Sequence, residues 1–174
     1  IYKNKYVLPL GFTYQYKIDS KVFNQLPAHQ KTAMLYKAAV INDSIFGQYA
    51  TGLPQLTDSD TAVNYLDGEY VEDINKLKED TLAISLFSNN RIKGSINLPT
   101  RKVLFFSIPY SDGWSAKVDG QPYQLIRANI GFTGLVLNKG QHNVELTFRP
   151  TTFKYSIPIS ITSIVLYMAL AVYY

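Results

Sequence analysis

The sequence predicts a mainly β fold of the β-sandwich or jelly-roll kind, with one α-helix in the N-terminal half and an apolar helix at the C-terminus. The 174-residue chain is rich in aromatic residues, with 14 tyrosines and 9 phenylalanines. Such side chains suit a pleated, half-buried surface. Short alternating runs also recur between glycine-containing turns, as in sandwiches and jelly rolls. The last 18 residues, by contrast, carry no charged side chain.

Composition limits the classes of function. The chain has no cysteine, which excludes disulfides and thiolate metal sites. Its net charge is +4, and its basic residues are spread along the chain, so we expect no nucleic-acid partner. The chain begins at Ile1 and shows no signal peptide, so we expect it to be a fragment of a longer protein.

The N-terminal half contains a predicted strand and a predicted helix. Residues 6–18 end in alternation, with Phe12, Tyr14, Tyr16 and Ile18 on one face. Residues 28–41 have helical spacing of apolar side chains and no glycine, and Pro27 suits the start of a helix. The polar stretch 42–60, which follows, is predicted to be a loop.

Nine short segments follow in the rest of the domain. Residues 62–66 and 69–74 flank an Asp67-Gly68 turn, and residues 81–87 and 92–98 flank a polar break. The most regular strand candidates come last: 102–108, 114–118, 122–127, 132–137 and 142–149. Asp119-Gly120 lies between two of them and is the dipeptide expected in a type I′ hairpin turn.

The apolar tail divides the chain into a β-rich domain, residues 1–155, and a transmembrane segment, residues 156–174. Residues 157–174 are at the lower limit of length for a helix that spans a bilayer. The alternative is a strand, because Ile157, Ile159 and Ile161 alternate, but a run this long favours the helix. Two basic residues, Arg149 and Lys154, flank its start and weakly favour a cytoplasmic domain.

The sequence offers no catalytic or metal-binding motif. It lacks G-x-S-x-G, S-x-x-K and P-loop patterns, and neither His29 nor His142 has a partner at metal-ligand spacing. A pair of carboxylates would suit glycoside hydrolysis. However, Asp112 and Asp119 both read as turn residues. We therefore assign no catalytic residue, metal or cofactor.

A carbohydrate-binding surface remains a hypothesis for residues 110–127. Trp114 is the only tryptophan, and its flat ring suits either stacking on a sugar or anchoring the core. Tyr110, Tyr123 and Arg127 are the other candidates, with Arg127 suited to an anionic or hydroxylated ligand. Both interpretations of Trp114 stay open at this point.

Several ordered runs resemble the C-terminal extracytoplasmic domain of the YfhO family of bacterial membrane proteins. They are LFFSIPY (104–110), GWS (113–115), VDG (118–120), NIGF (129–132), GQHNVEL (140–146) and RP (149–150). The opening NKYVLPLGF (4–12) is similar to the entry to that domain. In the family a final transmembrane helix follows the last strand, which matches residue 157 onward.

The resemblance implies a many-helix protein similar to lipid-linked-sugar glycosyltransferases of the GT-C type, which modify cell-envelope polymers such as lipoteichoic acid. It places residues 1–155 on the extracytoplasmic side, and we follow it over the weak charge bias. It also places the catalytic acids outside this sequence. The implied partners are the N-terminal transmembrane region of the same protein, cell-envelope polysaccharide or teichoic acid, and membrane lipid around residues 156–174. Three roles stay open for the domain: shaping an acceptor site, binding a glycan, or acting as a structural lid or interaction surface.

Overall fold

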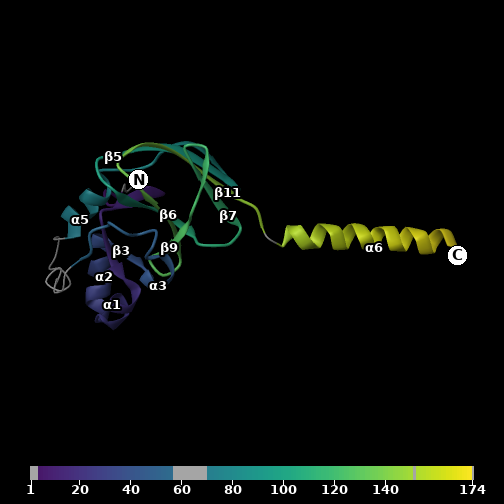
Figure 1. Cartoon of the computed structure of the whole chain (residues 1–174), viewed down its shortest axis with the longest axis horizontal. Coiled ribbons are helices and arrows are strands. Elements are labelled where there is room, and N and C mark those ends of the chain that lie inside the picture. The colour runs from purple at the N-terminus through teal and green to yellow at the C-terminus, as the bar shows by residue number, and fades with distance from the viewer. Residues whose placement is uncertain (1–3, 57–69, 151, 174) are drawn as a thin grey trace.

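A computed structural model describes residues 4–56, 70–150 and 152–173, and shows two β-sheets with a helix extending away from them (Figure 1). The first sheet has six strands, in the order β1 (Gly11–Tyr14), β6 (Lys102–Pro109), β10 (Phe132–Leu137), β9 (Ile126–Ala128), β3 (Ala38–Ile41) and β2 (Tyr16–Asp19). The second has five, in the order β4 (Ala83–Ser88), β5 (Arg91–Leu98), β11 (Gly140–Phe148), β7 (Trp114–Val118) and β8 (Gln121–Tyr123). The predicted mainly β fold is confirmed.

One buried cluster draws side chains from both sheets, so their apolar faces pack against each other. The cluster includes Leu104, Phe106 and Leu135 of the six-stranded sheet, and Ile92, Ile96 and Leu146 of the five-stranded sheet. Alternation in the sequence produces this arrangement, because every second side chain of a strand points to the same face. In β5, for example, Ile92, Gly94, Ile96 and Leu98 are buried, while most residues between them are more exposed.

The predicted strand at the N-terminus is two strands. β1 and β2 are separated only by Gln15, yet they form opposite edges of the six-stranded sheet. The sheet must therefore curl strongly, so that its two edges come close together. Each edge strand then finds its own partner: β1 pairs with β6, and β2 pairs in parallel with β3.

The structure has five described helices: α1 (Ser20–Gln25), α2 (Ala28–Lys37), α3 (Asp43–Phe46), α5 (Tyr70–Leu77) and α6 (Phe153–Tyr173). The predicted helix at 28–41 begins correctly but is four residues too long. Its last four residues form strand β3, all buried, because they pair with β2 on one side and β9 on the other. Helix α3 lies in the stretch that was predicted to be a loop.

Two further segments differ from the sequence-based prediction. The predicted strand at 122–127 is divided between β8 and β9, which belong to different sheets. The predicted segment at 69–74 falls mainly in α5, where Ile74 and Leu77 are buried at helical spacing. The segment predicted at 62–66 lies outside the described residues.

The hairpin turn and the apolar tail match their predictions. Asp119 and Gly120 have φ angles of 53° and 82°, as a type I′ turn requires. The tail is the helix α6, and its window Ser156–Tyr173 has a mean hydropathy of 1.8 over 18 residues. By length and composition this helix is able to cross a membrane.

Candidate functional site

The best candidate site is a cavity of about 350 Å³ between the helices that follow β2 and β3 and the loops at one end of the six-stranded sheet. This volume is within the range of small-ligand pockets. Tyr110, Asp112 and Arg127 contribute from the C-terminal half of the domain. The wall formed by α1 and α3 contributes Asn24, Asn42 and Phe46, among others. We call this the Tyr110–Arg127 cavity.

Tyr110 and Arg127 are in direct contact in the cavity. The guanidinium carbon of Arg127 lies 5.0 Å from the centre of the Tyr110 ring, a cation–π distance. The Tyr110 ring also contacts Phe46, at 6.3 Å and with an interplanar angle of 64°. The guanidinium is therefore held over an aromatic face inside the cavity.

The backbone fixes both side chains. Strand β6 ends at Pro109, and the next residue donates its backbone N–H to Gly131 O at 2.8 Å, in the turn between β9 and β10. Arg127 is the middle residue of β9 and pairs with Thr133 of β10. The β9–β10 hairpin thus positions Arg127 beside the residue that leaves β6.

Asn129 ties this hairpin to the rest of the sheet. Its side-chain oxygen accepts a hydrogen bond from Val40 N at 2.9 Å, and its amide nitrogen donates to the Tyr14 hydroxyl at 3.0 Å. The Tyr14 hydroxyl in turn donates to Leu35 O at 2.7 Å. Burial raises the pKa of Tyr14, so this hydroxyl stays neutral and remains a donor.

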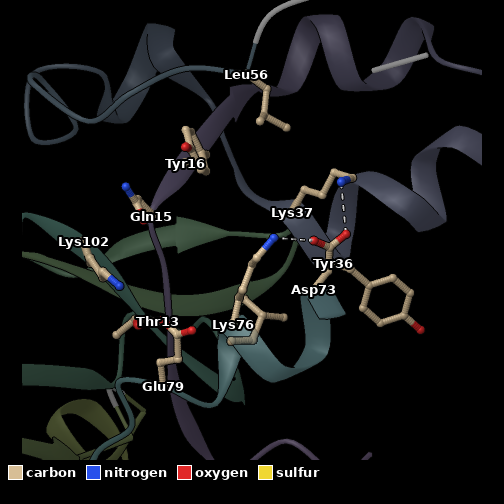
Figure 2. Close-up of a pocket in the computed structure, with 11 residues that line it drawn as sticks. Thr13, Gln15, Tyr16, Tyr36, Lys37, Leu56, Asp73, Lys76, Glu79 and Lys102 are labelled. Carbon is tan, nitrogen blue, oxygen red and sulfur yellow. Dashed lines mark ion pairs between the residues drawn. The ribbon is translucent and has the colours of Figure 1, made fainter. Parts of the chain in front are cut away.

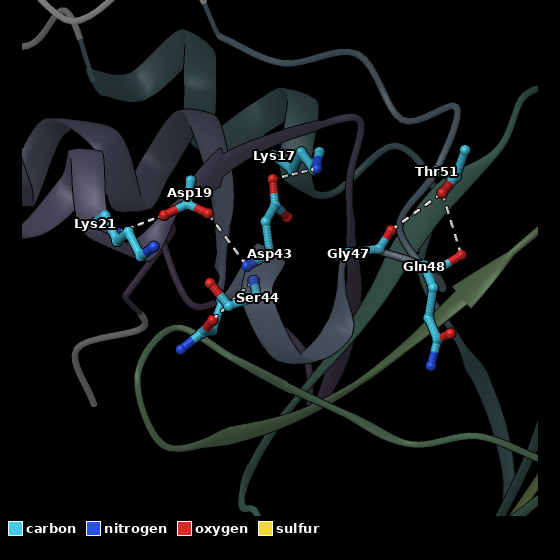
Figure 3. Close-up of polar contacts among 9 residues, drawn as sticks. Lys17, Asp19, Lys21, Asp43, Ser44, Gly47, Gln48 and Thr51 are labelled. Atoms are coloured by element: carbon cyan, nitrogen blue, oxygen red, sulfur yellow. Dashed lines mark hydrogen bonds and ion pairs between the residues drawn. The ribbon is translucent and has the colours of Figure 1, made fainter.

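A polar network around α3 positions the other wall of the cavity (Figure 3). Asp19 caps α1 by accepting from Lys21 N at 2.6 Å, and its other oxygen accepts from Asp43 N at 3.2 Å. The carboxylate of Asp43 forms an ion pair with Lys17 of β2 at 2.6 Å. These contacts hold α3 against the end of β2, so Asn42 and Phe46 face Arg127 across the cavity.

The other two sequence candidates lie outside the set of described residues that line this cavity. Trp114 is half-buried at the start of β7 and packs against Phe148, with ring centres 5.0 Å apart. Tyr123 of β8 donates its hydroxyl to Val136 O of β10 at 2.6 Å, which links the two sheets. The structure therefore brings Tyr110 and Arg127 together but not Trp114 or Tyr123.

Sequence reasoning missed the residues of the α1 and α3 wall. One local signal was present: Asn42 accepts from Ser44 N at 3.0 Å, which is the N-cap pattern that starts α3. This pattern predicts a helix start but gives no indication that it lies close to Arg127, 85 positions later. The contact depends on the pairing of β3 with β9, in which Ile41 lies opposite Ala128.

A second cavity, of about 450 Å³, lies between β1, β2, α2 and α5 (Figure 2). It is lined by several lysines, but acidic neighbours hold each of them. Asp73 lies 3.0 Å from Lys37 and 3.9 Å from Lys76, while Lys102 pairs with Asp80 at 2.7 Å. Because these charges balance one another, this cavity is the weaker candidate for an anionic ligand.

Within residues 4–56, 70–150 and 152–173, no three side chains of the His, Cys, Asp or Glu type lie close enough together to hold a metal ion. The Tyr110–Arg127 cavity contains one carboxylate, that of Asp112, together with amides and aromatic rings. This set suits recognition of a hydroxylated or anionic ligand by hydrogen bonds and stacking.

Comparison with known proteins places this chain in a family. Residues 48–160 match the family described as bacterial membrane protein YfhO. A protein of Bacillus subtilis (strain 168), named "Uncharacterized protein YfhO", is 34% identical over 80 residues. These residues are 46% of this chain but only 9% of that relative, so the matched region is a small part of the longer protein. No solved structure matches the chain.

Proposed function

Because this chain belongs to the YfhO family of bacterial membrane proteins, we propose that its β-rich part is an accessory extracytoplasmic domain that holds a cell-envelope glycan near the membrane. Residues 1–155 are this domain, and residues 156–174 are its membrane segment. The domain operates together with the N-terminal transmembrane region of the same protein, and membrane lipid surrounds residues 156–174. Membrane association itself follows from the family and from the apolar helix α6.

The enzymatic part of the proposal concerns the longer protein. Its family resemblance points to a glycosyltransferase of the GT-C type that uses a lipid-linked sugar and modifies a polymer such as lipoteichoic acid. The present chain supplies no catalytic residue in this scheme. It binds the acceptor polymer, while the chemistry takes place in the rest of the protein.

The Tyr110–Arg127 cavity is the observation that carries the proposal. The Arg127 guanidinium lies over the Tyr110 ring, so the Tyr110 hydroxyl and the amides of Asn24 and Asn42 are the groups that suit the hydroxyl groups of a sugar. Arg127 adds planar N–H donors that match a phosphodiester group. Teichoic acids combine both features, a hydroxylated chain and repeated phosphates.

The test is a titration of the full 174-residue chain, reconstituted in lipid nanodiscs, with lipoteichoic acid and with a neutral oligosaccharide. We expect Arg127→Ala to weaken binding of lipoteichoic acid by about tenfold or more, as loss of a charge-assisted contact does. Lys117→Ala is the matched control, because it removes an exposed cation from β7 outside the cavity. Tyr110→Leu should weaken binding of both ligands, because it removes a hydroxyl group from the cavity and the ring over which Arg127 is held.

The opposite results would be equally informative. If the folded wild-type chain binds neither ligand, glycan binding is wrong and the domain is a lid or an interaction surface. If Arg127→Ala and Lys117→Ala weaken binding equally, the attraction is a general effect of positive charge. Circular dichroism of each variant confirms that it is folded.

A further inference from the structure

The membrane helix leaves the domain at one end of β11, and the connection is short. Strand β11 ends at Phe148 and α6 begins at Phe153, so four residues separate them. Four extended residues span at most about 14 Å. The apolar window then starts at Ser156, less than one helical turn into α6. With α6 as the membrane segment proposed above, this end of β11 lies close to the surface of the bilayer, whatever direction the helix takes.

Three turns of the domain share this end through backbone hydrogen bonds. Phe148 N donates to Asn90 O in the β4–β5 turn, and Arg149 N donates to Gly113 O in the β6–β7 loop, both at 2.8 Å. The β6–β7 loop is joined to the β9–β10 turn by the bond from Tyr110 N to Gly131 O at 2.8 Å. We call these segments, residues 87–91 (the β4–β5 turn with the strand residues beside it), 110–113 and 129–131, the anchor edge.

Two of the most exposed apolar side chains of the domain belong to the anchor edge. Among the described residues before α6, the four most exposed large apolar side chains are Ile130 at 68%, Phe87 at 67%, Val7 at 62% and Ile45 at 61%. Ile130 and Phe87 belong to the anchor edge, and Ile45 lines the Tyr110–Arg127 cavity together with Ile130. An exposed apolar side chain is ordinary by itself, but the two most exposed ones both belong to segments hydrogen-bonded, directly or through a neighbouring loop, to the membrane exit.

Ile130 also has an unfavourable backbone conformation. Its φ angle is 74°, in the left-handed region that a β-branched residue strongly disfavours. Asn129 precedes it with φ 46°, and asparagine or glycine would suit both positions of this turn. Burial does not compensate for the strain, since the Ile130 side chain is two-thirds exposed. Strain of this kind, at an exposed position, indicates a role outside the chain itself.

We propose that the anchor edge rests on the bilayer that α6 spans, with Ile130 and Phe87 inserted at the boundary between headgroups and acyl chains. Arg149 stands at the exposed start of the connection, where it faces the phosphates of the headgroups. Apolar tips flanked by basic side chains are the combination that binds such interfaces. The contact makes the domain a fixed extension of the membrane helix, and it does not depend on glycan binding.

The absence of cysteine allows a direct test with single labels. Ile130→Cys and Phe87→Cys, each labelled with a polarity-sensitive fluorophore, are placed in nanodiscs of mixed zwitterionic and anionic phospholipid. Two positions serve as controls. The first is Val7→Cys, which is about as exposed and is next to Tyr6, whose ring contacts that of Tyr70 in α5. The second is Lys139→Cys. Lys139 precedes β11 at its far end, about 30 Å from Phe148 along the strand.

We expect the labels at 130 and 87 to show blue-shifted emission and several-fold stronger quenching by lipid-borne nitroxides than the two controls. Equal quenching at all four positions would overturn the proposal. A label-free measurement uses Trp114, the only tryptophan, which lies next to Gly113 of the anchor edge. Brominated lipids should quench Trp114 in the wild type and in Val7→Asp, but much less in the Ile130→Asp, Phe87→Asp double variant. Quenching that is the same in all three proteins would also overturn it.

Discussion

Ile130 is the residue at which backbone preference and sequence conflict most clearly. The turn that carries it is well fixed, since Asn129 accepts from Val40 N and donates to the Tyr14 hydroxyl. Asn129 tolerates a positive φ angle, as its side chain type commonly does. Ile130 has the same kind of φ angle without this tolerance. The conformation is therefore imposed by the surrounding contacts and not chosen by Ile130.

We predict that Ile130→Gly raises the free energy of unfolding by about 1 kcal/mol. Relief of a strained conformation is worth about 1–3 kcal/mol, and the greater freedom of glycine in the unfolded chain offsets part of this gain. Thermal unfolding of the chain in a mild detergent measures the difference. Ile96→Val, which removes one buried methyl group, should lower stability and serves as the reference for a packed isoleucine. A loss of stability in Ile130→Gly would show that the side chain packs within the fold.

Asp119 makes the far end of the domain sensitive to acid. Its carboxylate accepts from Asn143 N at 2.8 Å and lies 2.8 Å from Nδ1 of His142. The pKa of Asp119 lies below its usual value. The hydrogen bond from Asn143 N is the main cause, and the contact with His142 is the second. Because the folded pKa is lowered, the stabilisation is present above the pKa of the unfolded chain, about 4. This stabilisation is lost as the pH falls through the pKa of Asp119 in the folded protein.

We therefore predict that Asp119→Asn is less stable than the wild type near neutral pH and that the difference shrinks as the pH falls below about 4. Asparagine keeps the turn conformation, so the comparison isolates the charge. Urea unfolding at a series of pH values measures the difference in the free energy of unfolding between the two proteins. A difference that stays constant down to about pH 2 would mean that the carboxylate charge has no part in it.

At the scale of elements, local pattern was sufficient where glycine-containing turns bound a strand on both sides. Strands β7 and β10 were predicted with the bounds that the structure gives, because such turns mark both of their ends. Prediction from local pattern failed where a partner distant in the sequence determines the secondary structure. Residues 38–41 continue a helical pattern, but the space between β2 and β9 makes them a strand. Residues 122–127 carry no signal for the change of sheet that separates β8 from β9.

The candidate site shows the same division between local and distant information. Tyr110 and Arg127 were identified from their residue types near turns, and they are in contact. Trp114 was identified in the same way, but the rest of its environment, with Phe148 against its ring, depends on the pairing of β7 with β11. The α1 and α3 wall of the cavity was not foreseen, because its approach to Arg127 depends on the long-range pairing of β3 with β9 and of β2 with β3.

Helix α6 carries the prediction that belongs to this scale. Leu166 lies near the middle of the apolar window and is exposed, as a side chain that faces lipid would be. We predict that Leu166→Arg raises the free energy of membrane insertion by about 3 kcal/mol, whereas Tyr173→Arg at the end of the window has little effect, because a terminal arginine reaches the headgroups. Carbonate extraction of membranes that contain the 174-residue chain measures how much of each variant is retained. Equal retention of the two variants would contradict a membrane-spanning α6.

At the scale of the whole molecule, the glycan proposal and the membrane proposal concern neighbouring surfaces. Gly113 O accepts from Arg149 N at the membrane exit, and Asp112, next in the chain, lines the Tyr110–Arg127 cavity. If the anchor edge rests on the bilayer, the cavity lies within reach of a polymer whose lipid anchor is in the same membrane. The bilayer contact then raises the effective concentration of the polymer at the cavity without adding any contact to it.

This arrangement predicts a selective effect of Phe87→Asp, a substitution at the anchor edge outside the set of described residues that line the cavity. We expect it to weaken binding of lipoteichoic acid embedded in the same nanodisc by about tenfold or more, because the effective concentration falls. Binding of the deacylated, soluble polymer should be unchanged, because the cavity is intact. Fluorescence titration of both ligands with the wild type and Phe87→Asp makes the comparison. Equal loss for both ligands would mean that Phe87 supports the fold of the cavity, and no loss for either would separate the cavity from the membrane contact. Failure of the wild type to bind either polymer would refute glycan binding alone, since nitroxide quenching at position 87 reports the bilayer contact independently.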